Sequence, residues 1–213
     1  MTAGTSTGAI RAIPIALTRK SSAAPGDSGL APTLTWTLPA GFSAGEIQWP
    51  YPERIPVGPL MNFGYHGTVV LPVQIQPLSS LPDQDTFTLR ARADWLVCQE
   101  DCIPESADLE LTLPTQADPA PMDPRWNESF ATVRQRLPMP VPWPVSFAID
   151  EATLTLDLTT GRAAERIAAL EFFPLEDGLI THAAPQALSR AESSLRLTVA
   201  RGTQPKPPES VAG

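Results

Sequence analysis

The sequence predicts a mostly β protein built from β-sandwich units, and three observations indicate this class. Proline is frequent, with 25 among 213 residues, which disfavours long helices. Apolar and polar residues alternate with period two in several short segments, as expected of half-buried strands. Proline-rich turns separate these segments, and many short strands with such turns are typical of sandwiches.

Composition excludes some classes of function. The formal net charge is −8, whereas a nucleic-acid-binding surface needs basic residues to neutralise phosphates. No apolar run reaches the roughly 18 residues of a membrane-spanning helix. Residues 1–24 contain only a short apolar run at residues 12–17, so they show no clear signal peptide. We treat them as an atypical or truncated amino-terminal segment.

The first β region covers residues 25–114. Residues 34–38 alternate, and residues 68–77 form a short apolar run that ends at a proline. The clearest alternation is over residues 87–98 and places these residues on one face: Phe87, Leu89, Ala91, Ala93, Trp95 and Val97. Residues 107–113 alternate in the same way, so the two segments predict a hairpin joined by a short polar connection.

A linker with a single helix is predicted over residues 115–145. Asp123 is a suitable N-cap, Pro124 fits the first helical position, and Pro138 ends the pattern. Four apolar residues recur at helical spacing, which indicates a helix packed on a sheet. They are Trp126, Phe130, Val133 and Leu137.

The second, smaller β region covers residues 146–201. The apolar parity changes at Asp150 and Glu151, which indicates a tight turn, and Asp177-Gly178 is a second turn signal. Residues 194–200 alternate as a final strand. Residues 202–213 are polar and proline-rich, as in a linker or tail.

Both cysteines lie in the predicted hairpin, at Cys98 and Cys102. If no bulge intervenes at Ile103-Pro104, both share the polar face of their strands. Four extended residues span about 13 Å, whereas a disulfide needs Cα atoms roughly 4.4–6.8 Å apart. The three residues between the cysteines must therefore fold back, and a three-residue hairpin loop would bring the pair together.

The residues leave two roles open for this pair, a stabilising bridge and a redox pair. A loop of about five residues is worth roughly 2 kcal/mol, against about 4.7 for a hundred-residue loop. A zinc site is the weakest interpretation, because His66 and His182 lie far away without finger spacing. Glu100 and Asp101 disfavour a thiolate, so the pair suits a relay to a partner with an activated cysteine. No other motif for catalysis, a metal or a cofactor is visible.

Residues 89–114, LRARADWLVCQEDCIPESADLELTLP, resemble the amino-terminal periplasmic domain of the DsbD/ScsB group of thiol:disulfide interchange proteins. The WLVC and CIPE segments around the cysteines are the most specific part. The resemblance extends from about Pro25 to Ala200 and includes residues 25–75 and 172–188.

This resemblance implies an immunoglobulin-like β-sandwich in the periplasm, as part of an inner-membrane protein. It implies a thiol:disulfide oxidoreductase, a protein-disulfide reductase, with Cys98 and Cys102 as the redox dithiol and no metal or cofactor. The implied partners are periplasmic thioredoxin-fold proteins, including those of cytochrome c biogenesis. A membrane electron-transfer domain, absent from this chain, would supply the electrons. The resemblance also suggests an aromatic cap loop over the pair, with Phe63 and Tyr65 as candidates; the alternative is two ordinary half-buried aromatics.

Three departures from the family pattern are visible. The better-known DsbD domain has a wider cysteine spacing, residues 1–24 do not follow the family's opening segment, and no membrane domain follows Gly213. We therefore expect an excised domain or a fragment. The alternative function is a non-catalytic β-sandwich binding module with a passive structural disulfide.

Overall fold

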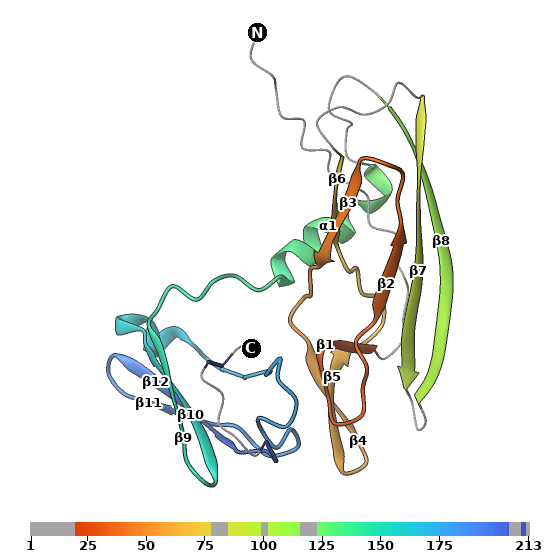
Figure 1. Cartoon of the computed structure of the whole chain (residues 1–213). Coiled ribbons are helices and arrows are strands. Elements are labelled where there is room, and N and C mark those ends of the chain that lie inside the picture. Colours follow the sequence, from red (N-terminus) through yellow and green to blue (C-terminus); the bar gives the residue numbers. More distant parts are fainter. Residues whose placement is uncertain (1–19, 78–84, 99–101, 116–122, 205–209, 212–213) are drawn as a thin grey trace. The chain divides into compact units, whose positions relative to one another are not determined.

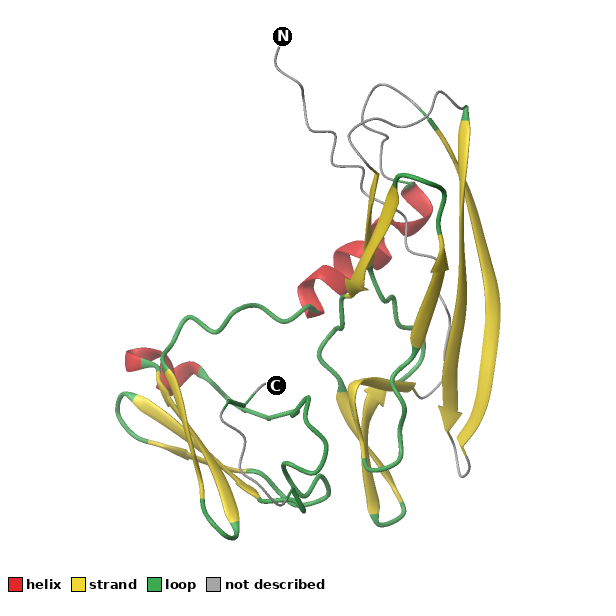
Figure 2. Cartoon of the chain, viewed as in Figure 1, coloured by secondary structure: helices red, strands yellow, loops and turns green. Residues whose placement is uncertain are grey.

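The computed structural model describes residues 20–77, 85–98, 102–115, 123–204 and 210–211, and they form a mostly β protein (Figure 2). The chain divides into two compact units that interleave in sequence. The hairpin unit comprises Met1–Ser22, Leu30–Glu53 and Tyr65–Pro138. The carboxyl-terminal unit comprises Ala23–Gly29, Arg54–Gly64 and Met139–Gly213. Among the described helices, none is long and apolar enough to cross a membrane.

The hairpin unit contains an antiparallel sheet in the order β2-β7-β8 (Figure 1). These strands are β2 (Thr33–Thr37), β7 (Thr86–Cys98) and β8 (Cys102–Pro114). The predicted apolar face of β7 is buried at its first four positions, where at most 6% of each residue is exposed. These positions are Phe87, Leu89, Ala91 and Ala93. The period-two prediction for this hairpin is confirmed.

A second sheet of the hairpin unit pairs β3 (Phe42–Ile47) with β6 (Val73–Pro77). The ring of Phe42 on β3 packs against the ring of Phe87 on β7, with centroids 4.9 Å apart. The two sheets therefore share one core, as expected of an immunoglobulin-like sandwich.

Helix α1 (Pro124–Arg136) also belongs to the hairpin unit. As predicted, Asp123 caps it and accepts a hydrogen bond from the backbone two residues later. Val133 is buried, and the Arg136 carbonyl accepts a hydrogen bond from the Tyr51 N–H at 2.9 Å. The Arg136 guanidinium lies 4.8 Å from the centre of the Tyr51 ring. The helix is thus packed on the unit, as its apolar stripe predicted.

The carboxyl-terminal unit contains a four-stranded sheet in the order β11-β12-β10-β9. Its core includes Leu156 from β10 and Leu197 from β12, which are register partners. The predicted turn at Asp150 joins the first two strands, and the predicted final strand is β12. The elements are β9 (Val145–Ile149), β10 (Thr153–Thr159), the 3-10 helix η1 (Gly161–Arg166), β11 (Ala187–Arg190) and β12 (Ser194–Ala200).

The sequence predicts one domain over residues 25–114, but residues 23–29 and 54–64 group with the carboxyl-terminal unit instead. These residues carry most of a sheet in the order β1-β5-β4. Its strands are β1 (Lys20–Gly26), β4 (Glu53–Val57) and β5 (Leu60–Tyr65).

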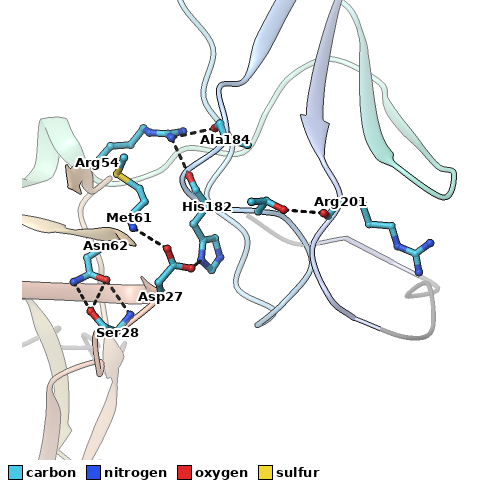
Figure 3. A network of polar contacts seen from close by, with 9 residues as sticks. Asp27, Ser28, Arg54, Met61, Asn62, His182, Ala184 and Arg201 are labelled. Atoms are coloured by element: carbon cyan, nitrogen blue, oxygen red, sulfur yellow. Dashed lines mark hydrogen bonds and ion pairs between the residues drawn. The ribbon is translucent and has the colours of Figure 1, made fainter. Parts of the chain in front are cut away.

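Polar contacts explain this grouping (Figure 3). Asp27 Oδ1 lies 2.8 Å from His182 Nδ1, and Arg54 donates to the His182 carbonyl at 2.8 Å. The ring of Phe63 packs against those of Phe173 and His182. Residues far apart in sequence therefore meet within the carboxyl-terminal unit.

Candidate functional site

The β7–β8 hairpin brings both cysteines to its tip in an uninterrupted register. Pairing runs from Thr86 opposite Pro114 to Cys98 opposite Cys102 without a shift. The bulge that could have formed at Pro104 is absent, so the cysteine positions lie on the polar face, as predicted. Cys102 is exposed and disulfide-bonded, and the only other cysteine in the sequence is its register partner, Cys98.

Hydrogen-bonded and non-hydrogen-bonded residue pairs alternate along an antiparallel hairpin. This alternation, which we call the hydrogen-bond phase, explains how the cysteine positions suit a disulfide. Thr115 N–H donates to the Asp85 carbonyl at 2.8 Å, one step beyond the end of the ladder. Odd-numbered residues of β8 are therefore in hydrogen-bonded pairs and even-numbered ones are not. Pro104 agrees with this phase, because it has no N–H to donate. The cysteines form a non-hydrogen-bonded pair, the closer kind, with Cα atoms roughly 4.5 Å apart, which is within the range of a disulfide.

The same phase determines where the backbone of Cys102 points. In a non-hydrogen-bonded pair, the N–H and C=O of each residue point away from the partner strand. Strand β8 is the outer strand of its sheet. The polar backbone groups of Cys102 are therefore directed toward the open edge, next to a proline that offers only a carbonyl.

Polar side chains pair across β7 and β8 on the face of the hairpin that also carries the two cysteine positions. They are exposed, so each stabilises the hairpin only weakly, but together they favour a single register. The pairs are Thr88–Thr112 at 2.9 Å, Arg90–Glu110 at 2.9 Å, Arg92–Asp108 at 3.3 Å and Arg92–Ser106 at 2.7 Å.

The tip projects as a two-stranded arm, which we define as residues 95–98 together with 102–105. Strand β2 pairs with β7 only as far as Asp94, and β7 and β8 continue past the end of β2 (Figure 1). Ile103 is 60% exposed, and Val97 opposite it is half-buried. A disulfide at the end of such an arm can be reached by another protein.

The two candidate cap residues are core side chains in this structure. Phe63 is 0% exposed and packs in the carboxyl-terminal unit, while Tyr65 is 1% exposed and donates to the Pro50 carbonyl at 2.6 Å. Burial raises the pKa of Tyr65 above its usual range. Both are more deeply buried than the half-buried aromatics considered as the alternative. The contacts described for the two residues explain their burial without the cysteines, and the cap role stays a prediction.

The two histidines each have a carboxylate neighbour. His66 Nδ1 lies 3.1 Å from Glu53, and His182 Nδ1 lies 2.8 Å from Asp27. Within the described part of the chain, no cluster of three or more potential ligands is placed to hold a metal. Sequence reasoning missed the Asp27–His182 contact, because nothing in the local pattern links positions 155 residues apart.

Residues 23–114 match the family described as thiol:disulfide interchange protein DsbD, N-terminal. This part of the chain holds the hairpin with both cysteines, and it belongs to that family of thiol:disulfide interchange domains. The predicted family is confirmed.

A particular solved structure extends the likeness beyond this segment. It is the crystal structure of the N-terminal periplasmic domain of ScsB from Proteus mirabilis, which is 22% identical in sequence with a TM-score of 0.54. The match covers 85% of this chain and 68% of the other. At this identity the likeness shows a shared fold. The comparison with curated proteins gives no match.

Proposed function

We propose that this chain is a periplasmic thiol–disulfide exchange module, whose Cys98–Cys102 pair passes reducing equivalents to thioredoxin-fold proteins. One observation carries the proposal: the disulfide-bonded Cys102 is exposed at the end of an arm, in a segment that belongs to a thiol:disulfide interchange family. The periplasmic location is supported by the family and by the ScsB domain of similar fold, which is itself periplasmic.

The exchange proceeds through a mixed disulfide. In the reduced module, the thiolate of Cys102 attacks one sulfur of the partner's disulfide, and the partner's second sulfur leaves as a thiolate. The thiolate of Cys98 then attacks the Cys102 sulfur and releases the partner with both its sulfurs reduced. Two electrons move to the partner and the module ends with an intrachain disulfide. The two protons released by the module's thiols match the two taken up by the partner.

We assign the partner-facing sulfur to Cys102 because of its surroundings. Within the two-stranded arm both strands are edges, but only the edge of Cys102 contains a proline, Pro104, which has no N–H to pair there. Glu100 and Asp101 adjoin the pair in sequence, and like charge disfavours a thiolate. A partner cysteine of low pKa would favour the second step, because it leaves the mixed disulfide more readily as a thiolate.

The source of electrons in this proposal is a membrane domain of the family, which would reduce the module after each exchange. The partner class includes thioredoxin-fold proteins of disulfide isomerisation and cytochrome c biogenesis. The rival function is a binding module in which the disulfide is passive. The short loop argues against a mainly structural role, because its closure is worth only roughly 2 kcal/mol.

The reduction potential separates these two functions. Structural disulfides of secreted proteins usually lie below about −300 mV, and exchangeable ones lie higher. We expect a potential above this limit and transfer of electrons from the reduced module to an oxidised thioredoxin-fold protein. We also expect the reduced module to unfold cooperatively, with both thiols open to alkylation in the folded state. A lower potential, or loss of cooperative unfolding on reduction, would support the passive disulfide.

A further inference from the structure

Trp95 and Glu105 form a hydrogen-bonded pair at the base of the arm. The indole Nε1–H donates to Glu105 Oε2 at 3.2 Å, and the two residues are register partners. Trp95 directly follows Asp94, the last residue of β7 that pairs with β2. The bond therefore lies where the hairpin changes from a three-stranded sheet to a two-stranded arm.

Among the residues that the structure describes, the two register pairs closer to the tip have apolar side chains. The next register pairs are Leu96–Pro104 and Val97–Ile103, whose side chains cannot form hydrogen bonds with each other. A two-stranded hairpin is at best marginally stable in water. In the oxidised form the disulfide closes the tip, but reduction removes this cross-link. Strand pairing in the reduced arm then depends on the backbone ladder and on contacts at its base.

We propose that Trp95 and Glu105 are positioning residues for the redox pair: their hydrogen bond holds the base of the arm in register after reduction, so the two thiols stay opposite each other. This inference rests on the proposed function, because it concerns the same cysteines. Formation of the Cys98–Cys102 disulfide depends on how often the two sulfurs come into contact. A looser arm therefore lowers the equilibrium constant for disulfide formation, and the reduced module becomes a weaker reductant.

The test is the equilibrium between the module and dithiothreitol. Two thiols of the module are oxidised to one disulfide, while the cyclic disulfide of oxidised dithiothreitol takes up two electrons and two protons. Removing the bond with Glu105→Ala should lower the equilibrium constant for closure about threefold to tenfold, as expected for an exposed hydrogen bond to a charged group. Trp95→Phe keeps an aromatic ring but loses the donor, so it should lower the constant similarly.

Three further variants make the result specific. Glu105→Gln removes the charge but keeps an oxygen acceptor, so its constant should stay close to that of the wild type. Adding Trp95→Phe to Glu105→Ala should lower the constant no further. Glu110→Ala breaks the pair with Arg90, within the part of the hairpin that β2 covers, and should leave the constant unchanged. Equal constants for Glu105→Ala and the wild type, or an equal loss in Glu110→Ala, would overturn the inference.

This equilibrium does not depend on a protein partner. If the module fails to reduce any thioredoxin-fold protein, the proposed function is wrong, yet the dithiothreitol constants still decide whether Trp95 and Glu105 position the pair. Thermal unfolding of each oxidised variant checks that it is folded. Glu105 is exposed, so its variants should fold even if Trp95→Phe does not.

Discussion

At the scale of single residues, the side chains of Cys102 and Tyr65 lie in opposite environments. Cys102 is exposed on an outer strand, where a partner can approach its sulfur. Tyr65 is 1% exposed, and its hydroxyl has a defined acceptor in the Pro50 carbonyl. The first residue is placed for exchange and the second for stability.

Trapping by single cysteine variants should be asymmetric. Cys98→Ser keeps the thiol of Cys102, whose strand edge carries Pro104 and lacks its N–H, so this variant should accumulate a mixed disulfide with an activated thioredoxin-fold partner. Cys102→Ser should trap at least several-fold less. Non-reducing electrophoresis after equal incubation measures the two yields. Equal yields, or a larger yield from Cys102→Ser, would count against the assignment of the partner-facing sulfur.

The Tyr65→Phe variant should lower the free energy of unfolding by about 1–2 kcal/mol, because it leaves the buried Pro50 carbonyl without its donor. Denaturant titration measures this change, and Tyr51→Phe, at a residue that is 52% exposed, is the control.

The cap role makes a separate prediction: Phe63→Ala or Tyr65→Ala should speed reaction of the reduced pair with a small disulfide. Unchanged rates in folded samples of both variants would exclude a cap.

At the scale of elements, short turns decide how strands meet. The turn between β9 and β10 depends on Asp150, whose carboxylate accepts hydrogen bonds from Ala152 N–H at 2.8 Å and Thr153 N–H at 2.7 Å. It also accepts one from the Thr153 hydroxyl at 2.8 Å. These bonds, the Ala152 N–H first, lower the pKa of Asp150 from its usual value.

The lowered pKa of Asp150 predicts a pH dependence of stability. The folded carboxyl titrates below the unfolded value of about 3.9. Its contribution is therefore present above that value and is lost as pH falls through the lower, folded pKa. Asp150→Asn should be less stable than the wild type near neutral pH, and the difference should shrink in acid. Thermal melts across this range measure it; a difference that is constant with pH, or equal in Glu151→Gln, would contradict it.

At the scale of the whole molecule, the two units share the chain by interleaving. The family match covers residues 23–114, yet two parts of that segment, Ala23–Gly29 and Arg54–Gly64, belong to the carboxyl-terminal unit. His182 is central to this arrangement, because its ring contacts Asp27 and Phe63 while its carbonyl accepts from Arg54. The carboxyl-terminal unit should therefore depend on amino-terminal residues for its stability.

The Asp27→Ala variant tests this dependence. It removes the hydrogen bond to the buried His182 and the bond from the Met61 N–H to Asp27 Oδ2, so it should destabilise the carboxyl-terminal unit by about 1–2 kcal/mol. Amide hydrogen exchange should quicken in β10 and β12 and stay unchanged in β7 and β8. Asp157→Ala, at an exposed pair with Arg196, should change exchange much less. Equal acceleration in both units would refute the dependence.

Much of the secondary structure and of the site could be predicted from the sequence. The alternation over residues 87–97 predicted which face of β7 is buried, and the flanking residues Asp123 and Pro124 predicted where the helix begins. The face of both cysteines also followed from parity, because β7 and β8 pair without a bulge. These features depend on neighbours along the chain or directly across a short hairpin loop.

The sequence by itself determined the class of fold, the long hairpin and the helix, the family and the position of the cysteine pair at a hairpin tip. Only the tertiary structure decided which segments form each unit, that Phe63 and Tyr65 are fully buried, and that the pairing of β7 with β2 stops at Asp94 and leaves a two-stranded arm. Alternation and capping depend on local geometry, which the chain repeats every few residues. The contacts of Asp27 with His182 join residues that no local pattern relates, because they meet only when distant segments pack into the same core.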